Sequence, residues 1–165
     1  MVPIDPVSTG ISLLAICAFI FPILRACIRQ KAQRALQRAA FLNEAKTRDL
    51  HLSQTDFWRG QYGIGLDTAN QTVVYYNTSS EPTIQCISLP DIREVRFHKT
   101  SHLTGRGRSR EEIVDRLEIH LLGEPAVFPC FSLVFFDGDK HSDLCGEWPL
   151  AKKWEQLLRN AIAGI

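Results

Sequence analysis

One polar segment, KTSHLTGRGRSREE at positions 99–112, holds the residue types best suited to binding chemistry. Basic side chains alternate there with small residues, and the candidate ligand-binding set is Lys99, Arg106, Arg108 and Arg110. Guanidinium groups make bidentate contacts with phosphate and carboxylate groups. The pattern therefore predicts a flexible loop that binds an anion or a partner, such as a phosphorylated molecule, an anionic lipid headgroup or a nucleic-acid backbone. The alternative is a solvated loop in which Glu111 and Glu112 offset part of the charge.

No catalytic or metal-binding pattern accompanies this segment in the sequence. The G-x-S-x-G turn of hydrolases does not occur, and GRG lacks the spacing of a nucleotide-binding glycine loop. His98 and His102 are four residues apart, which suits metal chelation on a helix, whereas strand and loop are expected there. The segment DGDKHSD at 137–143 differs from a calcium loop because Trp148 stands where the closing glutamate is needed. We therefore expect a protein that is not an enzyme and needs no cofactor or metal.

Three cysteines follow the first third of the chain, at Cys86, Cys130 and Cys145. They are odd in number and show no C-x-x-C spacing, which argues against a zinc site. Reduced thiols are typical of a cytoplasmic protein. Because Cys86 and Cys130 lie in apolar strand-like segments, we expect them to be small buried side chains.

Length and charge distinguish two parts of the chain. Its 165 residues, 45% hydrophobic and 22% charged, suit about one folded domain and exclude intrinsic disorder. Residues 1–48 contain seven basic and two acidic residues, a net charge of +5, while the rest has a net charge of −4. The basic part therefore needs its own explanation.

The basic part contains an apolar segment without a charged side chain from Val7 to Leu24. About 20 apolar residues cross a bilayer core of roughly 30 Å, so we predict an N-terminal tail and transmembrane helix in residues 1–28. A cleaved signal peptide would have its basic residues before the apolar run, and a buried helix would show a polar stripe. Because basic residues only follow this segment, we predict a single-pass cell-membrane protein with its N-terminus outside and its C-terminal domain in the cytoplasm.

Residues 29–53 are predicted to form a basic juxtamembrane stalk helix, since 29–49 lack glycine and proline and are rich in helix formers. We expect anionic lipid headgroups to contact the basic residues around the span and the stalk, which are Arg25, Arg29, Lys31, Arg34 and Arg38. Two alternatives stay open: a solvated stalk and a self-associating helix.

Residues 54–165 change to an alternating, β-branched pattern typical of strands. YGIGLD and TVVYYN predict a hairpin, and TIQCISL, DIREVRFHK, RLEIHLL, AVF and FSLVFF predict further strands, six or seven in all. Tyr75-Tyr76 places one ring on each sheet face, so one ring is either exposed to a partner or covered by the stalk helix. AKKWEQLLRNAI has apolar residues at spacings of three and four, which predicts a C-terminal helix capping the sheets.

This order of elements, over about residues 57–163, resembles the pleckstrin-homology-like (PH-like) fold. The matching parts are the YGIGLD and TVVYYN hairpin, the strands ISL and IREVRF on either side of Pro90, and the closing helix with its central Trp154. The predicted fold class is accordingly α+β: a transmembrane helix and a basic stalk helix, then an antiparallel PH-like sandwich or barrel capped by a helix. The chain resembles membrane-anchored bacterial members of the fold more than eukaryotic lipid-binding ones, and the resemblance implies binding of peptides, proteins, lipid headgroups or further copies, usually without catalysis.

Two functional hypotheses follow. The first is a single-pass membrane protein whose cytoplasmic PH-like module serves as scaffold, adaptor or subunit of a membrane-associated complex, with the lipid bilayer and a protein partner or a homo-oligomer as its contacts. The second is a ligand-gated oligomeric membrane effector whose loop at Arg106–Arg110 binds a phosphorylated signal or nucleic acid, although nucleic acid is the less favoured partner.

Overall fold

The computed structural model describes residues 20–21, 25, 28–29, 31–32, 35–78, 83–105, 110–124 and 130–164. The chain divides into two compact units, Met1–Ala40 and Phe41–Ile165. Each unit is described by itself.

The N-terminal residues correct the membrane prediction. Among the residues that the structure describes, no helix is long and apolar enough to span a membrane. The predicted transmembrane helix, the single-pass topology and the cell-membrane localisation with a cytoplasmic domain are therefore wrong, and most of Val7–Leu24 lies outside the described residues.

Of the basic residues expected at headgroups, Arg25, Arg29, Lys31 and Arg38 are helical and exposed, and Arg34 lies outside the described residues.

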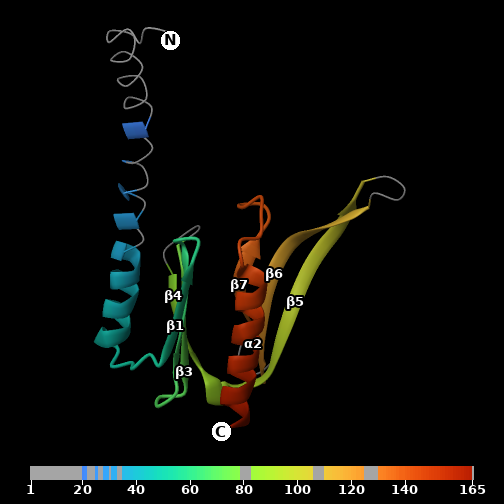
Figure 1. The fold of residues 1–165 in the computed structure, drawn as a ribbon. Coiled ribbons are helices and arrows are strands. Elements are labelled where there is room, and N and C mark those ends of the chain that lie inside the picture. The colour runs from blue at the N-terminus through green and yellow to red at the C-terminus, as the bar shows by residue number, and fades with distance from the viewer. Residues whose placement is uncertain are drawn as a thin grey trace, which may run out of the picture. The chain divides into compact units, whose positions relative to one another are not determined.

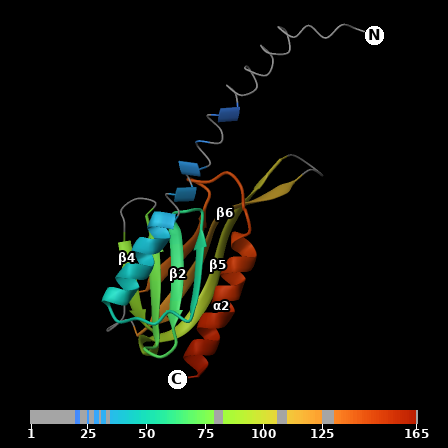
Figure 2. The ribbon, with the colours of Figure 1, turned by 60° about the vertical axis from the view of Figure 1, so that its left-hand side comes forward.

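The second unit contains two antiparallel sheets (Figures 1 and 2). The four-stranded sheet has its strands in chain order, namely β1 (Gln54–Trp58), β2 (Tyr62–Asp67), β3 (Thr72–Asn77) and β4 (Thr83–Ser88). A short 3₁₀ turn, η1 (Leu89–Asp91), leads to the three-stranded sheet of β5 (Ile92–Thr104), β6 (Glu111–Gly123) and β7 (Phe131–Asp137). The helix α2 (Glu147–Ala163) follows and packs against β5, β6 and β7.

Alternation along the strands builds the main core between the two sheets and α2. Val73 and Tyr75 on β3 and Leu117, Ile119 and Leu121 on β6 are buried in one cluster. The helix contributes Ala151, Trp154 and Leu158, each with 0% exposure. This three- and four-residue spacing is the apolar stripe of an amphipathic helix, so α2 closes the core.

A second, smaller cluster covers the outer face of the four-stranded sheet. Val74 and Tyr76 point to this face and pack with Phe41, which belongs to the preceding helix and is fully buried. The Phe41 ring lies edge-on to Phe57 with centroids 5.2 Å apart. The second face of the Tyr75-Tyr76 strand is therefore covered by helix residues.

Two glycines in β2 leave space for side chains that pack beside this second cluster. A Cβ at Gly63 would lie 2.8 Å from Cε1 of Phe57, and a Cβ at Gly65 would lie 2.8 Å from Cδ1 of Leu52. The Phe57 ring is held by Phe41, whereas the Leu52 methyl is the end of a flexible side chain. The two glycines therefore differ in how much a methyl group would cost.

We expect Gly63→Ala to lower the free energy of unfolding by about 1–3 kcal/mol, because the new methyl overpacks a rigid ring. Gly65→Ala is expected to cost less, since Leu52 can rotate away and the alanine also restricts the unfolded chain. Urea denaturation of both variants measures the difference. Equal stabilities for the two variants would contradict this packing.

The β2–β3 turn is organised by one buried carboxylate, Asp67. It accepts hydrogen bonds from the backbone N–H groups of Ala69, Asn70 and His51, at 3.0, 2.9 and 2.7 Å. Burial by itself would raise the pKa of Asp67, but these donors outweigh it and hold the pKa below its ordinary value. The contact to His51 also fastens the segment that leads into β1.

Candidate functional site

The two longest strands continue beyond the sheet as a ribbon. β7 pairs with β6 only from Arg116 to Leu121, so residues 101–104 of β5 and 111–114 of β6 pair only with each other. We call these residues the arm, and Figure 1 shows it extending away from the rest of the three-stranded sheet. A two-stranded ribbon is marginal by itself in water, so an arm of this kind suits contact with a partner.

Side-chain bonds stiffen the base of the arm. Glu112 accepts bonds from Lys99 Nζ at 2.5 Å and from Ser101 Oγ at 2.6 Å. His102 Nδ1 lies 2.7 Å from Asp115 Oδ1. The pKa of Glu112 is lowered, first by the hydrogen bond from Lys99 and then by the one from Ser101.

An exposed aromatic side chain lies beside the base of the arm. The Trp148 ring is 39% exposed and meets Phe97 edge-on, with centroids 5.2 Å apart. Lys99 Nζ lies 5.5 Å from the Trp148 centroid, and Lys152 Nζ lies 3.9 Å from the Phe97 centroid. Cations over aromatic faces are attracted by the ring quadrupole. Phe97, Lys99, Trp148 and Lys152, together with Leu103 further along the same face of β5, are called the Trp148 surface.

Strand alternation and a buried ion pair position these residues. Phe97, Lys99 and Leu103 are two or four residues apart, so they share one face of β5. The first turn of α2 is fixed by Glu147, which is 2% exposed and bonds Arg59 Nε at 2.5 Å and the Cys145 N–H. Arg59 also donates to the carbonyl of Asp143. The β1–β2 turn therefore holds the helix end that presents Trp148.

The bonds of Glu147 to Arg59 and to the Cys145 N–H, which we call the clamp, also affect the pKa of Glu147. Burial would raise its pKa, but the Arg59 guanidinium and the backbone donors hold the pKa below its ordinary value. The charged form is therefore the one that the folded chain stabilises.

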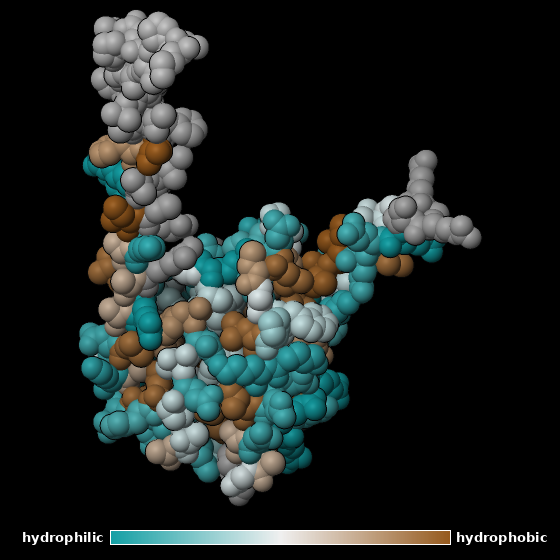
Figure 3. All heavy atoms as spheres, in the orientation of Figure 1, coloured by the Kyte–Doolittle hydropathy of each residue, from teal (hydrophilic) through white to brown (hydrophobic). Residues whose placement is uncertain are grey.

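Exposed apolar side chains concentrate in the same region. In the described part of residues 41–164, the large hydrophobic side chains that are exposed are Leu103, Ile113, Leu144 and Trp148. Leu103 is 66% exposed and Ile113 40% exposed, on opposite faces of the arm. Figure 3 shows apolar residues among hydrophilic ones along the arm. Such surface is typical of interaction sites.

The backbone of β5 is also accessible along one side. At its beginning, Arg159 of α2 donates to the carbonyl of Val95 at 3.1 Å. From Phe97 to Thr104, within the described residues, no backbone group bonds to an element other than β6. This free edge can pair with another extended chain.

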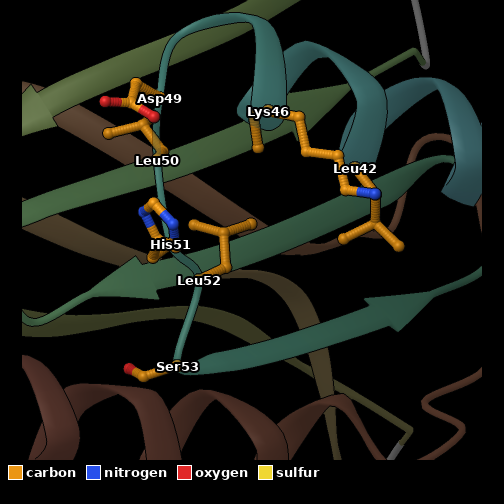
Figure 4. Close-up of a pocket in the computed structure, with 8 residues that line it drawn as sticks. Leu42, Lys46, Asp49, Leu50, His51, Leu52 and Ser53 are labelled. Carbon is orange, nitrogen blue, oxygen red and sulfur yellow. The ribbon is translucent and has the colours of Figure 1, made fainter.

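Described residues of the second unit also line two hollows that do not include Trp148. One of about 600 Å³ lies between the end of the first helix and the segment before β1 (Figure 4). Its mainly apolar wall includes Leu42, Ala45, Leu50 and Leu52. The other, of about 420 Å³, lies at the base of the arm. His141 lines it, and burial, followed by the charge of Arg59, lowers the His141 pKa.

Of the predicted anion-binding set, the structure describes Lys99 and Arg110. Lys99 is bonded to Glu112 and lies over Trp148. Arg110 is exposed at the start of the arm's second strand, and Arg106 and Arg108 lie outside the described residues. Among the described residues, no three possible metal ligands lie close enough together to form a metal site.

Sequence reasoning missed Trp148, Phe97 and Lys152 as a surface. In the sequence, Trp148 stands where the closing glutamate of a calcium loop is needed, and its position just before the apolar stripe of the helix is the signal for a surface role. The prediction that Cys86 and Cys130 are buried was wrong, because both are exposed.

Comparison of the chain with protein-family models, with curated proteins and with solved structures found no match.

Proposed function

We propose that the second unit is a non-catalytic, PH-like protein-binding module that takes up an extended segment of a partner protein along β5. The observation that carries this proposal is the free edge of β5 from Phe97 to Thr104, which lies beside the exposed Trp148. Addition of a strand to a sheet edge supplies affinity through the main chain, and side-chain contacts supply specificity.

The arrangement of elements supports the PH-like part of the proposal. A four-strand meander, a three-strand meander and a capping C-terminal helix follow each other in the order that the resemblance implies. Because one fold serves many functions, the binding mode rests on the Trp148 surface and not on the fold.

The chemistry of the surface defines the partner segment. A strand added to β5 would direct every second side chain to the face that holds Trp148 and Leu103, which favours apolar residues at those positions. Among the described residues, Lys99 and Lys152 lie there and Arg159 lies near the start of β5, and these three cations form ion pairs with two carboxylates, Glu112 and Glu155. The excess positive charge favours acidic residues in the partner. We therefore propose an extended segment rich in apolar and acidic residues.

A fluorescein-labelled peptide of ten alternating leucine and glutamate residues provides a direct probe. We expect it to bind the full chain, as measured by fluorescence anisotropy, and to bind the Trp148→Ala variant about 30-fold more weakly, the loss typical of a central tryptophan at an interface. Lys99→Glu is expected to weaken binding as well and to make it less sensitive to salt.

The control variant is Ile113→Ala, since Ile113 lies on the opposite face of the arm and should leave the affinity unchanged. A peptide in which lysine replaces glutamate should bind less well to the wild-type chain. If Trp148→Ala binds the acidic peptide as tightly as the wild type does, the proposed site is wrong.

A further inference from the structure

The four strands at the sheet edges differ in how they are protected. The edges are β1 and β4 in one sheet and β5 and β7 in the other. Natural proteins prevent unwanted pairing at edges with charged side chains or with caps from neighbouring elements. The strand without either protection is therefore the candidate for symmetric pairing with a second copy of itself, whereas a charged edge can still pair with a partner of complementary charge.

Three of the edge strands carry protection. In β7, the carbonyls of Phe135 and Val134 accept bonds from Trp58 Nε1 and Tyr75 Oη, both at 2.8 Å. In β1, the carboxylate of Asp56 bonds Lys153 and Trp154 of α2, at 2.6 and 2.8 Å. The β5 edge contains several charged side chains, which are Arg93, Glu94, Arg96 and Lys99.

β4 differs from these three strands in its composition and in its backbone contacts. Its sequence, TIQCIS, contains no charged residue and no proline or glycine. Within the described residues, no backbone group from Ile84 to Ser88 bonds to an element other than β3. From another element, Arg48 approaches, with its guanidinium 3.6 Å from Cys86 Sγ, and its charge is offset by Glu44 at 3.0 Å.

We infer that β4 pairs with β4 of a second copy of this chain, joining two four-stranded sheets into one across a two-fold axis. A symmetric antiparallel pair brings each strand against itself, so it is favourable only where no side chain meets a like charge. Of the four edge strands, β4 alone has no charged residue. The second copy is therefore the occupant that the charge pattern selects.

The geometry restricts the position of the two-fold axis. A two-fold axis perpendicular to the sheet leaves each side chain on the same face of the sheet. Residues that pair across the axis must therefore share a face, and this requires that the axis pass a residue that pairs with its own counterpart in the second copy. The centre of β4 lies at Gln85 and Cys86, which makes these the two possible axis positions. Cys86 is opposite Val74 on the outer face and is exposed. The two copies of residue 86 then lie directly opposite or on the adjacent diagonal, roughly 5–8 Å apart.

The dimer has a consequence for binding. The β4 edges and the Trp148 surfaces are in different sheets, so both copies keep a free binding surface. A bivalent partner would gain avidity without any new contact. The dimer does not depend on the proposed peptide binding, and failure of either proposal leaves the other standing.

Charge exchange at residue 86 tests the inference with the full chain. Light scattering after size exclusion should give the wild-type chain twice its monomer mass of 18.7 kDa. Cys86→Glu and Cys86→Lys should each weaken dimerisation at least about tenfold, because like charges then face each other near the axis. An equimolar mixture of the two variants should restore the dimer mass, because opposite charges then meet.

The mixture is the decisive sample, since Arg48 in the same chain attracts glutamate and repels lysine at this position. Cys145→Glu is the matched control, as it charges another exposed cysteine and should leave the dimer intact. Circular dichroism checks that each variant is folded. A monomeric wild type, a Cys86→Glu variant that still dimerises, or a mixture that stays monomeric would each overturn the inference.

Discussion

Replacing Trp154 with alanine is expected to lower the free energy of unfolding by about 3–5 kcal/mol, the cost of removing a large buried aromatic side chain. Trp154 is 0% exposed in the core between α2 and the sheets. Its indole N–H also donates to Asp56 Oδ2 at 2.8 Å, which ties α2 to β1. A loss of this size is a large part of the stability of a typical domain. Urea denaturation followed by circular dichroism measures it.

Trp148→Ala provides the matched control, because it makes the same substitution in the same helix at a ring that is 39% exposed. We expect it to cost less than about 1 kcal/mol, since little packing is lost at the surface. The pair separates the structural tryptophan from the binding one. Similar losses for both variants would contradict the different roles assigned to them.

Glu147→Gln is expected to have the second large effect, about 3–5 kcal/mol, because it leaves the charge of Arg59 without its buried partner. The matched control is Glu124→Gln, which breaks the exposed pair between Arg93 and Glu124 and should cost less than about 1 kcal/mol. A double-mutant cycle of Arg59 and Glu147 measures the coupling directly. A coupling close to zero would show that the clamp does not hold the start of α2.

The same pair makes stability depend on pH. The folded state holds the pKa of Glu147 below its ordinary value of 4.5. Its contribution to stability is therefore complete above pH 4.5 and is lost as the pH falls through the lower pKa of the folded state. Asp67 acts in the same direction, since its pKa is also lowered. Urea midpoints measured against pH should fall less steeply in Glu147→Gln than in the wild type.

Local sequence patterns predicted where the strands lie better than they predicted how long the strands are. The expected hairpin of YGIGLD and TVVYYN corresponds to β2 and β3, because alternation and a polar turn are visible in the chain itself. The first half of the loop expected from Lys99 to Arg110 is strand, since β5 continues to Thr104. Cross-strand contacts such as Lys99 with Glu112 stabilise this extension, and pairs of this kind are not apparent in a single strand's sequence.

The apolar run at the N-terminus gave a prediction that the structure contradicts. Composition and the order of charges predicted a membrane span, but the described residues contain no helix that could form one. The burial of Phe41 against the outer face of the four-stranded sheet had no signal in the sequence beyond the general idea of a covering helix. Phe41 packs against Phe57, whose ring lies where a side chain at position 63 would be.

The sequence by itself determined the local structure of the second unit: strand alternation, turn residues, and a C-terminal helix with one apolar face, each of which follows from neighbouring residues. The tertiary structure decided which distant side chains meet. Arg59 reaches Glu147, Trp148 contacts Phe97 and Lys99, and among the described residues only β3 bonds to the backbone of β4 from Ile84 to Ser88. These contacts depend on how the two sheets and the helix pack, because residues far apart in the chain become neighbours only when the core between those elements is buried.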